Sequence, residues 1–255
     1  MKDLFFIFLL PFYLISNSVG NPGNPYVIQE GLWISDKLSV CVKAGSEGYF
    51  ILNEKDRFDK SAREASFHAL RLDGVAASGL VRVTLFERMD IYSLLGSMHM
   101  EPRFKINEII YKAKTENRLW WKAGTKLILL QWNDTCLGGD INFSGYKSPT
   151  EYVDRNGAAF PSGDFKFRFK QWQIALGLST KIGYFYPYAG AAIINKDMRM
   201  DELSFSEKRR VLFKQPHRAG AFIGVTLSPV STILIAAEAR FINENSITVN
   251  AEIRF

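Results

Sequence analysis

The sequence lacks an apolar run long enough for a transmembrane helix. Such a helix needs about eighteen consecutive apolar residues, and no segment of the 255-residue chain reaches that length. The run from Leu4 to Ile15 is shorter and is interrupted by Pro11. A membrane protein built from helices is therefore not expected.

Signatures of catalysis and of nucleic-acid binding are also missing. None of the three histidines, His68, His99 and His217, belongs to an H-E-x-x-H motif, and G-x-S-x-G and phosphate-loop motifs are absent. The net charge of +6 is scattered, without a basic stripe that carries interleaved aromatics. We expect no enzymatic activity, no metal, no cofactor and no nucleic-acid partner. The alternative is a barrel hydrolase that uses His99 or His217 at its outer rim.

The N-terminus has the layout of a secretory signal peptide. Lys2 precedes the apolar run, and the small and polar residues SNSVGN follow it, which predicts cleavage between Ser16 and Gly20. No cysteine follows the run, so a lipoprotein anchor is not indicated. We expect an exported protein with a signal peptide over 1–20 and a periplasmic N-terminal segment over 21–36.

Alternating apolar and polar residues predict strands through the rest of the chain. In the last ten residues, SITVNAEIRF, every second residue from Ile247 to Phe255 is apolar, which is typical of a strand with one wet face. In the segment 164–179 the apolar phase changes, which predicts a β-bulge near Lys170 and Gln171. The expected strands are 37–44, 76–86, 90–100, 118–132, 135–146, 164–179, 183–195, 218–227, 231–242 and 246–255.

The connectors between these strands alternate in length. Tight turns are expected at 87–89, 133–134, 180–182 and 228–230, and long outer loops near 45–75, 101–117, 147–163 and 196–217. Short periplasmic turns and long outer loops are typical of outer-membrane barrels, whose spanning strands are half polar. We predict an all-β transmembrane antiparallel up-and-down β-barrel over 37–255, with about ten strands, or twelve if the loops hide another pair. A secreted β-sandwich is the alternative.

The polar faces of these strands predict which side chains line the lumen. Rings of like charge in a pore set ion preference, so an anion-preferring pore is one hypothesis. The other is that these groups pair with one another and fill a narrow barrel, as Arg240 and Glu252 on adjacent strands would do. The candidates are Lys43, Arg82, Lys122, Lys126, Asp140, Arg168, Lys170, Glu238, Arg240, Glu252 and Arg254.

Aromatic residues near strand ends and the two cysteines have expected positions too. Cys41 and Cys136 are expected at different depths, so a bond between them is not expected. Cys136, beside a periplasmic turn, is a candidate for an intermolecular disulfide, and a free thiol is the alternative. The residues expected in interfacial girdles are Trp120, Trp121, Trp132, Trp172, Tyr184, Tyr186 and Tyr188.

Six segments also follow the order of motifs in one known family. They are VGNPGNPYVIQEGLW (19–33), SVCVKAGSEGYF (39–50), LFERMDIYSLLGS (85–97), LILLQWNDTCLGGDINFSGYKSPTEY (127–152), WQIALGLSTKIGYFYPYAG (172–190) and ARFINENSITVNAEIRF (239–255). Together they resemble the chlamydial major outer membrane protein family, which are porins. Cys136 lies close to the family's cysteine at the corresponding turn.

The resemblance implies an outer-membrane barrel of a Gram-negative bacterium that allows passive diffusion of small hydrophilic solutes or ions. It also implies contact with outer-membrane lipid and possible homo-oligomers. Bacterial barrels commonly end on an aromatic residue that the barrel-assembly machinery reads, and Phe255 has that position. Barrel diameter grows with strand number, so side chains can nearly fill a ten-strand barrel. The alternative function is therefore a structural or adhesive barrel with a plugged lumen, whose outer loops contact host or envelope partners.

Overall fold

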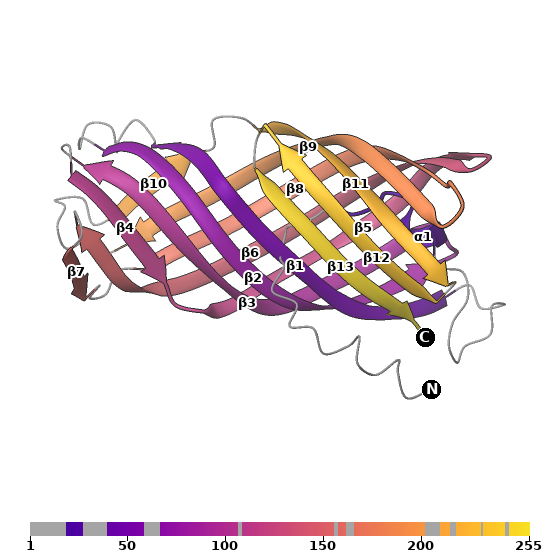
Figure 1. Ribbon diagram of the computed structural model, residues 1–255, viewed down its shortest axis with the longest axis horizontal. Coiled ribbons are helices and arrows are strands. Elements are labelled where there is room, and N and C mark those ends of the chain that lie inside the picture. Colours follow the sequence, from indigo (N-terminus) through magenta and orange to yellow (C-terminus); the bar gives the residue numbers. More distant parts are fainter. Residues whose placement is uncertain are drawn as a thin grey trace.

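The computed structural model is a closed antiparallel β-barrel that is much longer than it is wide (Figure 1). It describes residues 19–27, 40–58, 67–106, 109–155, 158–161, 166–201, 210–214, 218–230, 232–242 and 245–255. Residues 1–18 of the expected signal peptide and residues 28–36 of the expected periplasmic segment lie outside the described residues. Among the described residues, no helix is long and apolar enough to cross a membrane.

Ten strands form the wall in the described part of the chain, and each pairs with its neighbour in sequence. The ring closes where Lys43 to Ile51 of the first strand pair with Ser246 to Arg254 of the last. The all-β, ten-strand antiparallel barrel predicted from the sequence is thereby confirmed. The strands are β1 (Val40–Phe58), β2 (Phe67–Leu85), β3 (Met89–Ile106), β5 (Arg118–Trp132), β6 (Thr135–Arg155), β8 (Lys166–Thr180), β9 (Phe185–Asp201), β11 (Ala219–Val230), β12 (Ile233–Phe241) and β13 (Ser246–Arg254).

Three short strands belong to the end of the barrel opposite the C-terminus. Strand β4 (Ile109–Thr115) continues the line of β5, because both pair with β3 and β6. Strand β7 (Ala158–Pro161) pairs with β6 alone among the described strands. Strand β10 (Arg210–Lys214) pairs with β9 and with the end of β1, beyond the reach of β11, β12 and β13. The barrel therefore has fewer strands around it at this end than at the other.

Tight turns join the strands at the end that holds the C-terminus (Figure 1). Phe86, Glu87, Asn133 and Gly183 have positive φ in these turns, at 51°, 55°, 49° and 62°. Left-handed turn residues match the right-handed twist of a hairpin, so two strands can follow each other almost directly. The predicted connectors 87–89, 133–134 and 180–182 are confirmed within one or two residues, whereas 228–230 belongs to β11 and the fourth connector follows Val230.

The predicted long loops are largely wrong, because strands extend into all four of them. The extensions cover 45–58 and 67–75 of the first, 101–106 and 109–115 of the second, 147–155 and 158–161 of the third, and 196–201 and 210–214 of the fourth. The sequence pattern does not predict these extensions because their outward side chains are polar, as in an exposed loop.

Near the tight turns, the outer surface of the barrel is an apolar band. In β5 the outward residues run from Leu119 (66% exposed) to Leu129, and in β12 from Ile233 to Phe241. A transmembrane strand needs about 9–11 residues, and these stretches have that length. Because a soluble protein would not expose such a continuous band, lipid covers this part of the barrel. We refer to it as the membrane section, and to the rest as the outer section.

In the outer section the two faces of the wall exchange character. In β8, Phe167 and Phe169 point inward and are buried, whereas Arg168 and Lys170 point outward. Pairing along β8 is regular on both sides, so the predicted bulge at Lys170 is wrong. The apolar residues change from the outward face to the inward face because the strand passes from lipid into water. The outward surface then becomes polar, and the interior becomes apolar.

Candidate functional site

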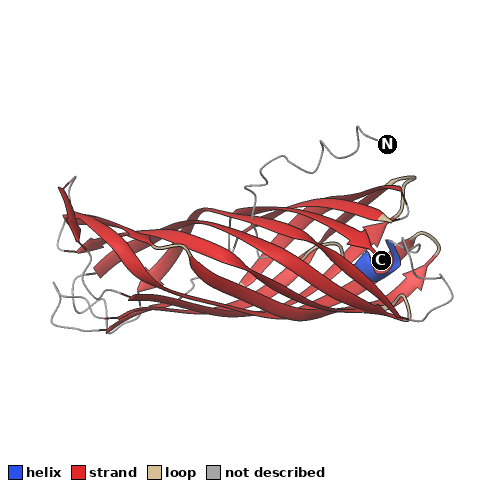
Figure 2. Cartoon of the chain, turned by 90° about the horizontal axis from the view of Figure 1, so that it is seen from below, coloured by secondary structure: helices blue, strands red, loops and turns tan. Residues whose placement is uncertain are grey.

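The interior of the barrel contains three layers along its axis. The outer section holds an apolar core that includes Phe104, Phe167, Phe169 and Met200. The membrane section holds a layer of buried charges. Residues 19–25 are buried at the end beside the tight turns, where Figure 2 shows the short helix Asn24–Val27. Each layer determines whether water or solutes can pass through the barrel.

Nine of the eleven predicted lumen residues lie in the charged layer. All nine are at most 4% exposed, so they are shielded from water. Arg168 and Lys170 are the exceptions, because they lie on the outer wall of the outer section; their prediction was wrong. The nine are Lys43, Arg82, Lys122, Lys126, Asp140, Glu238, Arg240, Glu252 and Arg254.

Arg82 connects two carboxylates from different strands. Its Nη1 lies 2.7 Å from Asp90 Oδ2, and its Nη2 lies 2.9 Å from Glu252 Oε1. The Thr84 hydroxyl donates to the other oxygen of Asp90 at 2.6 Å, and Lys43 Nζ lies 3.9 Å from it. The buried charges of β1, β2, β3 and β13 are thus neutralised locally.

Tyr92 lies among three cations of the charged layer. Its hydroxyl donates to Asp140 at 2.8 Å. Three cations lie near its ring: Arg82 at 5.4 Å from the centroid, Lys122 at 5.6 Å and Lys126 at 5.9 Å. The ring face and the Asp140 carboxylate together stabilise positive charges that would otherwise repel one another. Sequence analysis did not single out Tyr92, because an inward tyrosine is an ordinary strand residue.

Arg240 pairs within its own strand instead of across to β13. Its Nε lies 3.1 Å from Glu238 Oε1, and its Nη2 donates to Gln173 Oε1 at 2.7 Å. Glu252 is bound by Arg82, so the expected Arg240–Glu252 pair is wrong. The strand register decides this, because Arg240 lies opposite Ser246 whereas Glu252 lies opposite Leu234.

Residues 19–27, which we call the N-terminal plug, lie inside the barrel rather than free in the periplasm. The plug includes the short helix α1 (Asn24–Val27), which lies in the mouth near the C-terminus (Figures 1 and 2). Asn21 Nδ2 donates to Thr226 Oγ1 at 3.1 Å, and Lys43 Nζ donates to the Asn24 carbonyl at 3.2 Å. The expectation of a periplasmic segment is corrected for these residues.

Small residues of the wall make room for the plug. A Cβ added to Gly138 would lie 2.5 Å from the Pro22 carbonyl oxygen, so only glycine fits there. Gly23 in turn lies against the wall, because its added Cβ would lie 2.8 Å from Cys136 Sγ. The pair Gly138–Gly139 was the one signal in the sequence, since inward glycine leaves space that another segment must fill.

Both cysteines are buried and unpaired in the described structure. Cys41 is 5% exposed and Cys136 is 7% exposed, with Cys136 covered by the plug. This position disfavours the predicted intermolecular disulfide through Cys136, because the plug would first have to move.

The predicted girdle residues divide between the two faces of the wall. Trp121, Trp132, Trp172 and Tyr184 are exposed on the outer surface of the membrane section, as expected. Trp120, Tyr186 and Tyr188 are buried inside the barrel, so the girdle assignment is wrong for them. Neighbouring residues of a strand point to opposite faces, and an aromatic cluster near a turn therefore cannot all face lipid.

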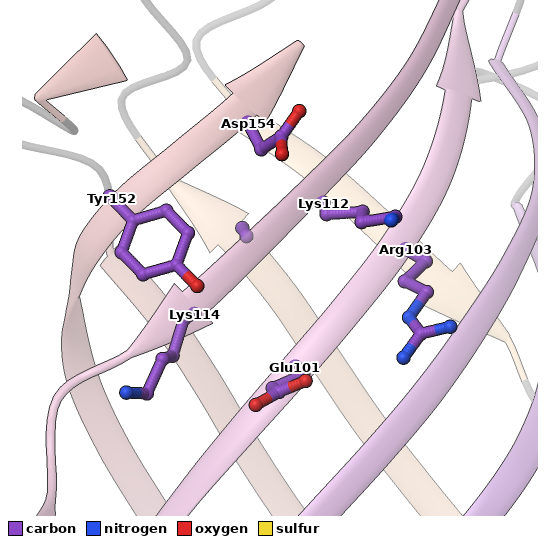
Figure 3. Close-up of a pocket in the computed structure, with 7 residues that line it drawn as sticks. Glu101, Arg103, Lys112, Lys114, Tyr152 and Asp154 are labelled. Atoms are coloured by element: carbon purple, nitrogen blue, oxygen red, sulfur yellow. The ribbon is translucent and has the colours of Figure 1, made fainter. Parts of the chain in front are cut away.

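A charged hollow of about 190 Å³ lies on the outer wall of the outer section (Figure 3). Cations and acids are mixed around it, and Arg103 and Lys114 also pair with carboxylates beside it, at 3.3 Å from Asp73 and Glu151. The labelled residues that line it are Glu101, Arg103, Lys112, Lys114, Tyr152 and Asp154. Its mixed charge suits contact with a polar surface.

Glu151 marks a phase slip in this wall. The pairing of β4 with β6 jumps from Tyr152 to Thr150, so Glu151 is an extra residue. In β6 the even-numbered side chains point inward as far as Thr150, and beyond the extra residue Val153 points inward instead. This bulge, rather than one in β8, changes which side chains point outward.

The described residues contain no cluster of three or more metal-ligating side chains. His99 lies on the outward side of β3, partly exposed. His217 and the side chain of His68 lie outside the described residues.

Comparisons with known proteins concern the fold. No family model matches the chain, and no curated protein matches it. Among solved structures, the chain is similar to the outer membrane protease OmpT from Escherichia coli, with 10% identity, TM-score 0.45, and coverage of 85% of this chain and 96% of that one. It is also similar to the translocator domain of the autotransporter NalP from Neisseria meningitidis, with 10% identity, TM-score 0.43, and coverage of 86% and 88%. At such values these similarities carry no argument about function.

Proposed function

We propose that this protein is a closed outer-membrane β-barrel of a Gram-negative bacterium, with a plugged lumen and an outer section that contacts host or envelope partners. The observation that supports it is the burial of the interior charges, which are at most 4% exposed. A diffusion pore needs water along its charged lining, because permeating solutes move in that water. The packed interior therefore favours the closed barrel over the porin.

Two independent barriers lie along the axis. The N-terminal plug fills the end beside the tight turns, and the apolar core fills the outer section. An apolar constriction excludes ions even where a gap is present, because an ion there would lose its hydration. Loss of one barrier alone should leave the barrel closed.

Conductance in planar bilayers tests the proposal. The refolded protein should show no ion current above that of lipid alone, and deletion of residues 19–27 should leave the current unchanged. Combining that deletion with Phe104→Ser, Phe167→Ser and Phe169→Ser should produce current, because water can then enter the charged layer from both ends of the barrel. Steady conductance by the unaltered protein would revive the porin function, with the interior lysines and arginines favouring anions.

The outer section supports the contact role, because it presents a rigid charged surface above the apolar band. Lys112 and Lys114 lie on opposite sides of the charged hollow (Figure 3). Proteoliposomes that contain the protein should bind cultured host cells more than empty liposomes do, and Lys112→Glu with Lys114→Glu should weaken this binding. Equal binding by empty liposomes would refute the contact role without affecting the closed lumen.

The resemblance to the chlamydial major outer membrane protein family stays a prediction of the sequence. Four further expectations also stay predictions: the signal peptide, the role of Phe255 in barrel assembly, the absence of enzymatic activity and a homo-oligomer. We propose them as parts of the same function, since an exported barrel of this kind requires assembly into the outer membrane.

A further inference from the structure

The N-terminal plug enters the barrel with its first residue innermost. Gly23 lies against Cys136 and Ser179, each within two residues of a tight turn. Val19 instead packs among residues farther from the turns, including Ala175 and Ile194. The chain therefore runs from Val19, deep inside the barrel, toward α1 in its mouth.

Glu238 binds the innermost end of the plug. The backbone N–H of Val19 donates to Glu238 Oε1 at 2.9 Å, and that of Gly20 donates to Oε2 at 2.8 Å. The Val19 carbonyl accepts a hydrogen bond from Lys126 Nζ. The Val19 side chain is 1% exposed, so this end of the plug is fixed by polar and apolar contacts together.

We propose that the chain is cleaved between Ser18 and Val19, and that the new α-ammonium group of Val19 pairs with Glu238 inside the barrel. The proposal rests on the export that we propose above. Ser16 and Ser18 put small residues at the third and first positions before this bond, as signal cleavage requires. Cleavage after Gly20 satisfies the same rule, but it would remove both residues whose N–H groups bind Glu238. The geometry therefore selects the Ser18–Val19 bond.

The reaction is a hydrolysis by a signal peptidase of the exporting cell. Water adds to the Ser18 carbonyl carbon, the C–N bond breaks, and the products are a Ser18 carboxylate and the Val19 amine, which takes up a proton. A single N–H donor becomes an ammonium group with three donors and a positive charge. Before cleavage the Glu238 carboxylate accepts from a neutral N–H group, and after cleavage it also attracts a full positive charge in a buried site. The plug is therefore held more tightly after cleavage than before it.

The N-terminal sequence of the protein extracted from outer membranes of an expressing Gram-negative host tests the cleavage site. Val19 as the first residue supports the proposal. A chain that begins at Met1, Asn17, Asn21 or any other residue overturns it. Conductance is not involved, so this result and a failure of the closed-lumen proposal are distinguishable.

Labelling of the Cys136 thiol tests the ion pair, because the plug covers this thiol. In a Cys41→Ala background, Glu238→Gln should raise the rate of reaction with a membrane-impermeant maleimide by about tenfold or more. Glu47→Gln is the matched control: it removes another buried carboxylate, which binds Lys122 at 3.3 Å, and should leave the rate unchanged. Equal rates for Glu238→Gln and its parent would overturn the ion pair.

An N-acetylated chain keeps the test independent of folding defects in the Glu238 variant. Refolded protein that begins at Val19 should protect Cys136, and the same chain with an acetylated amino group should label at least several-fold faster. The acetyl group removes the charge and leaves one N–H, which imitates the uncleaved bond. Identical labelling of the two chains would overturn the role of the ammonium group.

Discussion

At the scale of single residues, the interior shows how a barrel can bury many charges without opening to water. Arg82 touches Asp90 and Glu252, and Lys122 lies 3.3 Å from Glu47. A buried charge without a partner is strongly unfavourable, whereas a pair with hydrogen bonds is tolerated. The charges therefore form a packed layer and depend on one another.

Arg82→Met should destabilise the barrel by about 3–5 kcal/mol, because it leaves Asp90 and Glu252 buried without their shared partner. Urea unfolding in lipid vesicles measures the change. Arg199→Ala is the control: Arg199 pairs with Asp197 at 2.7 Å on the exposed outer wall, where such a pair contributes at most about 1 kcal/mol. Equal effects of the two variants would refute the dense packing of the interior.

The Asp197–Arg199 pair should also depend on pH. Hydrogen bonds from Arg199 hold the pKa of Asp197 below its usual value. The contribution of this pair is therefore fully present above the ordinary aspartate pKa and is lost as the pH falls through the lowered pKa. Comparison of the free energies of unfolding of the parent and Asp197→Asn over that acidic range should show a small difference that vanishes at its lower end. A difference that does not change with pH would contradict the assignment.

At the scale of strands, β8 shows why an alternating pattern can mislead. The change of apolar phase between Phe169 and Trp172 resembles a bulge, but the strand is regular. Period-two alternation reports which faces are apolar, and it does not report whether the apolar face meets lipid or a protein core. Only the position of the membrane boundary along the strand separates the two explanations.

Ile174→Arg should therefore destabilise the protein by about 2–4 kcal/mol, since Ile174 faces lipid in the apolar band and an arginine there must leave water. Arg168→Ile, six residues earlier and on the same outer face, should change stability by much less. Urea unfolding in vesicles again provides the measurement. The opposite order of the two effects would mean that the membrane boundary has been assigned to the wrong part of β8.

At the scale of the whole molecule, the barrel has two sections with opposite polarity. The membrane section is apolar outside and charged inside, and the outer section is polar outside and apolar inside. Each section meets its own surroundings, lipid or water, with a matching surface. The outer section thus resembles a soluble barrel that stands on a membrane barrel.

Quenching of tryptophan fluorescence by brominated acyl chains checks this arrangement. A variant that keeps only Trp172, which is 37% exposed on the outer face, should be strongly quenched in brominated lipid. A variant that keeps only Trp120, which is 0% exposed inside the barrel, should be quenched much less. Similar quenching of both would contradict the inward orientation of Trp120 and with it the packed core.

Local pattern was sufficient for the strands of the membrane section, most of the tight turns and the strand count, because alternation and turn chemistry depend on residues that are close in sequence. It was also sufficient to place nine of the buried charges on the inner face. The plug, the charge partners and the reversal of the two faces depend on contacts between distant segments, such as Val19 with Glu238. Those contacts arise only when the ring closes and brings residues more than two hundred positions apart into one narrow space, so tertiary structure alone decided whether the lumen is open or filled.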